Sequence, residues 1–157
     1  MQGFQGCPGS QMMDFSQKKD QTQGEVAGKI GSELRQWPVQ MHLVSPLAPY
    51  FKGADVLLTA DCVGYALGDY HRQYLKGKSL AIACPKLDEE QEVYVEKIVS
   101  WIDEAKINTL TVMIMQVPCC GGLLALAQEA AQKAKRKVPI KYLVVGIQGD
   151  ILQEEWV

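Results

Sequence analysis

The sequence predicts a three-layer α/β fold of the doubly wound (Rossmann/flavodoxin-like) kind, built around a mostly parallel sheet. Two observations predict it. Strand-like apolar runs alternate with helical stretches, and the longest apolar run is of the type that a sheet buries on both faces. The chain has 157 residues, of which 47% are hydrophobic and 22% are charged. That length and composition are typical of one domain with a substantial core.

Predicted strands and helices alternate along the body of the chain. The clearest helix is "DEEQEVYVEKIVSWIDEAK" at 88–106, where Val95, Ile98 and Ile102 fall on one face. Asp88 is expected to cap the start of this helix. The strongest strand is "NTLTVMIMQV" at 108–117. The predicted set comprises strands at 39–44, 55–60, 79–84, 108–117 and 140–147, the last being the final strong strand, and helices at 63–76, 88–106 and 120–136.

The first 31 residues differ from the rest of the chain. The stretch "SQKKDQTQGEVAGKIGSE" is polar, contains glycine and lacks a clear period, so a linker or loosely ordered arm is expected. Within this arm, "GCPGS" at 6–10 predicts a tight turn that presents Cys7. The expected division is therefore an N-terminal arm at 1–31 and an α/β domain at 32–157.

Bulk properties exclude several classes of partner. The formal net charge is −2, which argues against nucleic-acid binding. No apolar run is long enough to cross a bilayer, and the N-terminus lacks the pattern of a secretory signal. A cytoplasmic protein is expected, and structural disulfides are unusual there. The five cysteines then indicate metal binding, redox chemistry, catalysis or simple burial.

The cysteines of the α/β body follow predicted strands. Cys62 comes just after "DVLLTA", Cys84 closes "SLAIAC", and Cys119 and Cys120 follow "TVMIMQVP". Because the carboxyl ends of parallel strands share one edge of the sheet, these thiols are expected to converge there. Cys7 on its turn is expected to be able to fold over the same edge. One such cysteine alone is usually only a small buried hydrophobe.

The predicted edge suits thiolates. Helix N-termini carry partial positive charge and free N–H groups, which lower thiol pKa values and stabilise bound anions. Gly121 and Gly122 leave the backbone beside Cys119 and Cys120 open. Scattered thiolates favour an iron–sulfur cluster over zinc, since structural zinc sites show close C-x₂₋₄-C spacing. Zinc stays an alternative.

Other residues and motifs carry less functional information. Asp61 is expected to cap the helix that follows it. The histidines are expected at surface positions, and the tyrosines are expected to pack. These residues are His42, His71, Tyr65, Tyr70 and Tyr74. No G-x-G-x-x-G, G-x-x-x-x-G-K-[ST] or G-x-S-x-G motif is present in the sequence. The sequence thus lacks the usual signs of nucleotide-dependent chemistry and serine hydrolysis.

The ordered motifs resemble a known family. "GCPGS", "LRQWPVQMHLVSPLAPYFKGADVLLTADC", "LAIACPKLD" and "VPCCGGL" are similar to segments of bacterial 4Fe-4S ferredoxin-type iron–sulfur cluster-binding proteins, found widely in anaerobes. Longer relatives carry an N-terminal ferredoxin module, which these 157 residues lack. The resemblance implies a cluster that exchanges electrons with such a module or with another redox partner protein.

Three kinds of function stay open from the sequence. The first is an electron-transfer protein whose [4Fe-4S] cluster is held by Cys62, Cys84 and Cys119 or Cys120, with Cys7 as a further ligand. The second is a thiol- or zinc-dependent enzyme that uses Cys119 or Cys120 as its nucleophile or ligand. The third is a non-catalytic module that docks a redox partner. The oligomeric state is not determined by the sequence.

Overall fold

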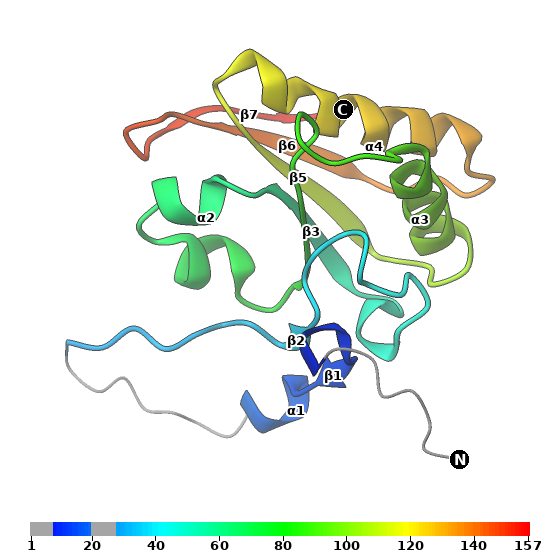
Figure 1. Cartoon of the computed structure of the whole chain (residues 1–157), viewed down its shortest axis with the longest axis horizontal. Coiled ribbons are helices and arrows are strands. Elements are labelled where there is room, and N and C mark those ends of the chain that lie inside the picture. Colours follow the sequence, from blue (N-terminus) through cyan, green and yellow to red (C-terminus); the bar gives the residue numbers. More distant parts are fainter. Residues whose placement is uncertain (1–7, 20–27) are drawn as a thin grey trace.

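A five-stranded sheet forms the middle layer of the protein, in the order β4-β3-β5-β6-β7 (Figure 1). The structure is a computed structural model that describes residues 8–19 and 28–157. The strands are β3 (Asp55–Ala60), β4 (Ser79–Ala83), β5 (Thr109–Met115), β6 (Ile140–Val145) and β7 (Ile151–Trp156). The first four run parallel, and β7 pairs antiparallel with β6.

Helices cover both faces of the sheet, as a doubly wound fold requires. The connection from β3 to β4 contains α2 (Val63–Ala66) and the π-helix η3 (Tyr70–Leu75). The helices α3 (Glu92–Asp103) and α4 (Gly121–Lys133) lead to β5 and β6. Crossovers between parallel strands are right-handed. The crossover from β3 to β4 runs in one direction along the sheet, and those from β4 to β5 and from β5 to β6 run in the other. Their helices therefore lie on opposite faces. Figure 1 shows α2 on one side of the sheet and α3 and α4 on the other. The predicted fold class is therefore confirmed.

The described part of the N-terminal region packs beside β4. It contains η1 (Pro8–Ser10), β1 (Met13–Asp14), α1 (Ser16–Lys19), β2 (Gln36–Trp37) and, further on, η2 (Pro49–Phe51). β1 pairs antiparallel with β2. The buried amide of Gln36 accepts from Leu80 N–H and donates to Leu80 O, both at 2.8 Å. The Gln36 side chain thus covers part of the free edge of β4.

The strand expected at 39–44 is wrong. Gln40 makes an isolated parallel bridge to Ile82, and the chain then turns at once. The N–H groups of Leu43 and Val44 both donate to Gln40 O, at 2.8 and 3.0 Å. Met41 and Val44 point into the core from this turn. Met41 and Val44 are three residues apart, so a turn can bury both without a strand, and this explains the misleading pattern.

The helix expected at 63–76 is broken into α2 and η3 by residues 67–69. Tyr70 lies in the core and its hydroxyl shares a 2.9 Å hydrogen bond with Thr59, whereas Tyr65 is 95% exposed. The packing role expected for Tyr65 is therefore wrong. The cause is their spacing, because residues five apart point to different faces even of an unbroken α-helix.

The start of α3 and the presence of β7 also differ from prediction. The helix expected to begin at Asp88 begins at Glu92, with Gln91 as its N-cap, because Asp88 takes part in a loop. The edge strand β7 was not predicted at all. Its sequence "ILQEEW" is polar and mostly exposed, which is usual for an edge strand and hides it from an apolar pattern.

The core lies between the sheet and both helical layers. Its largest fully buried side chains include Trp101 of α3 and Phe51, whose ring centroids are 4.9 Å apart. Within residues 8–19 and 28–157, no helix is long and apolar enough to cross a membrane.

The end of α3 is held by a carboxylate that accepts backbone N–H groups from the segment after α4. Asp103 accepts from Lys135 N–H at 3.0 Å and from Arg136 N–H at 2.9 Å. These hydrogen bonds lower the pKa of Asp103 below its ordinary value. The stabilisation is therefore present above the pKa that Asp has in the unfolded chain, about 3.9, and is lost as the pH falls through the folded value.

We expect Asp103→Asn to lower the melting temperature at neutral pH. The difference in melting temperature from the wild type should become smaller below about pH 4, where the Asp103 carboxyl of the unfolded chain is protonated. Thermal unfolding of both proteins across pH measures this. Glu104→Gln is the matched control, since it removes the neighbouring charge from the same helix end. A wild-type minus Asp103→Asn difference that stays constant down to pH 2 would contradict the linkage.

Candidate functional site

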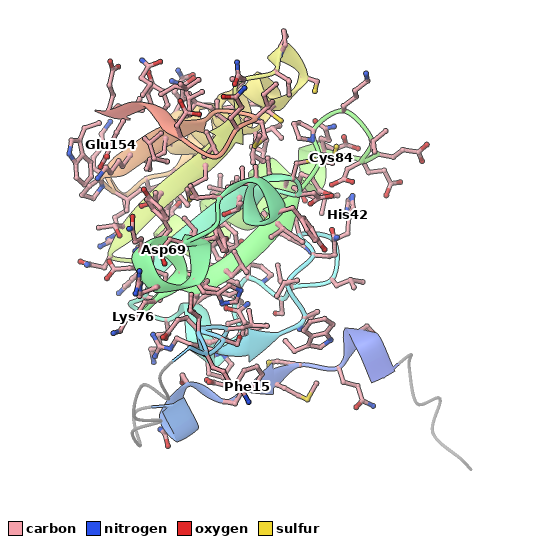
Figure 2. All side chains as sticks on the ribbon, turned by 90° about the vertical axis from the view of Figure 1, so that its left-hand side faces the viewer. Phe15, His42, Asp69, Lys76, Cys84 and Glu154 are labelled. Atoms are coloured by element: carbon pink, nitrogen blue, oxygen red, sulfur yellow. The ribbon has the colours of Figure 1, made fainter. Side chains whose placement is uncertain are left out.

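Three neighbouring strands end beside the thiols at the carboxyl edge of the sheet. β3 lies between β4 and β5, and the three strands are followed by Cys62, Cys84 and the Cys119–Cys120 pair. The chain leaves β3 for β4 on one side and later returns to β5 on the other, so the topological switch point lies between β3 and β5. Ligands of doubly wound folds bind at this point. In Figure 2, Cys84 lies at the opposite end of β4 from Lys76.

Cys62, Cys119 and Cys120 form the group nearest the switch point. Cys62 is the N-cap residue of α2 and Cys120 that of α4. Cys62 and Cys119 are exposed, whereas Cys120 is buried. Burial raises the pKa of the Cys120 thiol, a hydrogen bond with the Met115 backbone opposes this, and Cys119 and Cys62 raise it further. The charges of Cys119 and Cys62 therefore act on Cys120, and burial favours its neutral form.

Cys84 lies in a loop that closes on itself. Its N–H donates to the Asp88 carboxylate at 2.9 Å, and Asp88 N–H donates back to Cys84 O at 2.9 Å. Asp88 also accepts a 2.5 Å hydrogen bond from the Tyr94 hydroxyl. The Gln91 amide donates to Pro85 O and Asp88 O, at 2.5 and 2.9 Å. The backbone of Cys84 is therefore positioned by side chains at the start of α3.

Asp61 belongs to the same polar group as Cys84. Burial, and secondarily the negative charge of Asp88, raise the pKa of Asp61. Burial, the hydrogen bond to Asp88 and the charges of Asp88, Asp61 and Cys84 raise the pKa of Tyr94. The cap expected from Asp61 is wrong: α2 has no side-chain cap hydrogen bond, and Asp61 Oδ1 is buried without a partner among the described residues.

The start of α4 provides the contact between the two groups. A Cβ atom placed on Gly122 would lie 3.2 Å from Pro85 Cβ, whereas one on Gly121 would meet nothing within 4 Å. The missing side chain at Gly122 therefore lets the Cys84 loop approach the helix that follows Cys119 and Cys120. The need for glycine here is a matter of space, not of backbone conformation.

The predicted ligands are only partly gathered. Cys62, Cys119 and Cys120 lie together where β3 and β5 end. Cys84 lies with the carboxylates in a second group, where β3 and β4 end. Cys7 lies outside the described residues. In residues 8–19 and 28–157, no three His, Cys, Asp or Glu side chains are close enough together to hold one metal ion. A single zinc ion needs its sulfur ligands at about 2.3 Å.

The two histidines make different contacts, and His42 lies beside Tyr94 of the Cys84 group. His42 Nε2 hydrogen-bonds Glu89 O at 2.7 Å, and its ring packs 4.5 Å from that of Tyr94. His71 Nδ1 accepts from Glu33 N–H at 3.0 Å. Sequence reasoning missed Asp88 and Tyr94 as residues of the site. The spacing of Asp88 four residues after Cys84 was a usable signal, but Tyr94 looked only like part of an amphipathic helix.

The chain belongs to a Rossmann-like domain family, whose model matches residues 48–157. It is also similar to an uncharacterized protein of Archaeoglobus fulgidus, with 29% identity over 120 residues that cover 76% of this chain and 83% of the relative. No solved structure matches the chain.

The family match corrects one expectation. The resemblance to ferredoxin-type 4Fe-4S proteins is wrong as an assignment of family, since the matching family is a Rossmann-like domain. Two of the motifs that carried that resemblance, "LAIACPKLD" and "VPCCGGL", lie at the ends of β4 and β5 and in the turns after them. Such segments recur at the ligand edge of doubly wound folds because the topology places loops there.

We expect Gly122→Ala to be less stable than Gly121→Ala, although both changes have the same effect on chain composition. Alanine at either position has better helix propensity, worth up to about 1 kcal/mol. At Gly122 the contact with Pro85 offsets this gain, since overpacking typically costs about 1–3 kcal/mol. Urea unfolding of both variants measures the difference. Equal free energies of unfolding would contradict the packing of the Cys84 loop on α4.

We expect Tyr94→Phe to lower the free energy of unfolding by about 1–3 kcal/mol, because Asp88 loses a donor in a partly buried site. The Cys84 loop should also loosen, so that Cys84 of the metal-free protein reacts faster with iodoacetamide. Tyr70→Phe is the matched control, since it removes a buried hydroxyl from the hydrogen bond with Thr59. An unchanged alkylation rate of Cys84 in Tyr94→Phe, followed by mass spectrometry, would contradict the positioning role of Tyr94.

Proposed function

We propose that the carboxyl edge of this Rossmann-like domain binds a [4Fe-4S] cluster and that the protein transfers electrons. One observation carries the proposal. The neighbouring strands β4, β3 and β5 are followed by Cys84, Cys62 and Cys119 respectively. Thiolates are the ligands that such clusters prefer, and a rigid sheet can assemble them from distant parts of a chain.

The local electrostatics supports an anionic thiolate cluster. Cys62 and Cys119 are exposed, and each lies near the N-terminal end of a helix, α2 and α4 respectively. The thirteen-residue helix α4 contributes the larger positive end. Gly121 and Gly122 leave its first two residues without side chains. Mutual repulsion among thiolates favours binding of a cation that neutralises them.

A thiol-dependent enzyme is the second candidate. It is supported by the exposure of Cys119, two residues before the start of α4, where a nucleophile would be accessible. Cys120 suits this role less well, since burial raises its pKa and disfavours the reactive thiolate. A zinc site at the same thiols would need Cys84 and Cys119 to approach a common point. A docking module without chemistry would leave the thiols without a ligand.

The proposal extends to partner and compartment. A buried or half-exposed cluster at a sheet edge needs a second redox centre, so the partner is a redox protein or a ferredoxin module. The four described cysteines are all free thiols, which suits the reducing cytoplasm.

Anaerobic purification, with reconstitution from iron and sulfide, tests the function. We expect about four irons and about four sulfides per chain and a broad visible absorption that bleaches on reduction. Cys62→Ser, Cys84→Ser and Cys119→Ser should each lose most of the absorption. Cys120→Ala, at the buried neighbour, is the matched control and should keep it.

Absence of iron and sulfide from the wild-type protein after reconstitution would exclude the cluster. Stoichiometric zinc in that protein would support the zinc alternative. Rapid single-site alkylation at Cys119 without any metal would favour the thiol enzyme.

A further inference from the structure

Each of the four parallel strands is followed by a large apolar side chain that is exposed to solvent. These side chains are Tyr65 after β3, Leu87 after β4, Val117 after β5 and Ile147 after β6, and their exposed fractions are 95, 77, 38 and 65%. Single exposed apolar residues are ordinary on a protein surface. These four follow parallel strands, so they lie at the same edge of the sheet as the cysteines. We call them the apolar collar.

The segments that carry the apolar collar contact one another. Gln116 Oε1 accepts a 2.8 Å hydrogen bond from Ile147 N–H, which joins the segments after β5 and β6. A Cβ atom on Gly149 would lie 2.5 Å from Ala66 O, so the turn between β6 and β7 lies against α2. The loop after β4 packs on the start of α4. The collar therefore belongs to one connected surface, and exposed apolar surface of this kind marks protein interaction sites.

The same segments are acidic. Residues 61–66, 84–91, 116–121 and 146–150 contain five carboxylates, at positions 61, 88, 89, 90 and 150, and one cation, Lys86. Glu89, Glu90 and Asp150 are exposed. Two copies of this edge would repel each other, since like charges that meet across an interface suppress association. A partner with an apolar centre and lysines or arginines around it is complementary in both respects.

We propose that the apolar collar and the carboxylates around it form the docking surface for a basic redox protein. The inference rests on the proposed function and deepens it, since it names the surface that the partner contacts and the charge of that partner. Of the two kinds of partner proposed, it selects a separate redox protein with a basic face. The collar residues follow the same strands as the cysteines, so apolar contact brings the partner close to the thiols. The carboxylates orient the partner and speed its encounter.

Calorimetric titration of the full chain with oxidised cytochrome c tests the inference. Cytochrome c is a basic redox protein with lysines around its exposed haem edge. We expect saturable binding that weakens at least about tenfold between about 0.01 and 0.15 M ionic strength, because the Debye length falls from about 30 to 8 Å. Leu87→Ser and Ile147→Ser should each weaken binding about fivefold, through loss of apolar contact. The double variant Glu89→Lys and Glu90→Lys should weaken it at least about tenfold.

Leu47→Ser and Glu104→Lys are the matched controls and should bind as the wild type does. Leu47 is 56% exposed and lies just before η2, where Tyr50 O accepts a hydrogen bond from the hydroxyl of Ser79, the first residue of β4. Glu104 is the C-cap of α3. Both positions thus lie away from the carboxyl edge. Unchanged melting temperatures of all variants separate loss of docking from misfolding.

Three results would overturn the inference. They are no saturable binding at low ionic strength, tighter binding of an acidic ferredoxin than of cytochrome c, and equal losses in the edge and control variants. A dimer that Leu87→Ser disrupts in analytical ultracentrifugation would also overturn it, because the collar would then serve a second copy of the chain. Protein that docks cytochrome c but takes up no iron or sulfide would overturn the proposed function and leave the docking surface standing.

Discussion

The parallel pairing of β3 with β4 on one side and β5 on the other is the constraint on which the site depends. The register aligns Ala60 with Ala83 and Thr59 with Met113, so the strands end at nearly the same level. Three turns that are remote in sequence then begin side by side. The buried, apolar strands hold this register because a slip by one residue would turn every core side chain to the opposite face. The segments that carry the cysteines therefore start from fixed positions at this edge.

Two kinds of group share that edge. Thiols gather where β3 and β5 end, and carboxylates with a tyrosine gather where β3 and β4 end. Asp61 and Cys62 are consecutive, and each takes part in a different group. The loop after Cys84 packs on the start of α4, where Pro85 lies next to Gly122. A bound cation would bring the two groups together, because it offsets repulsion within each of them.

Much of the fold could be predicted because its strong elements are locally encoded. The apolar run of β5 and the amphipathic face of α3 are visible in the residue pattern of each segment alone. The segment 39–44 could not be predicted correctly, because its apolar residues reach the core from a turn. β7 escaped prediction because an exposed edge strand has no apolar pattern. The start of α3 was misplaced because Asp88 binds the Cys84 loop instead of capping the helix.

The sequence by itself determined the alternation of strands and helices and the presence of a cysteine after each of three strands. Both follow from local patterns, since a strand end and the residue beyond it are neighbours along the chain. Only the tertiary structure decided that Cys119 is exposed while Cys120 is buried. It also decided that one buried carboxylate oxygen of Asp61 has no hydrogen-bond partner among the described residues. Burial and hydrogen bonding depend on which remote segments pack together, and that information is not present in any one segment.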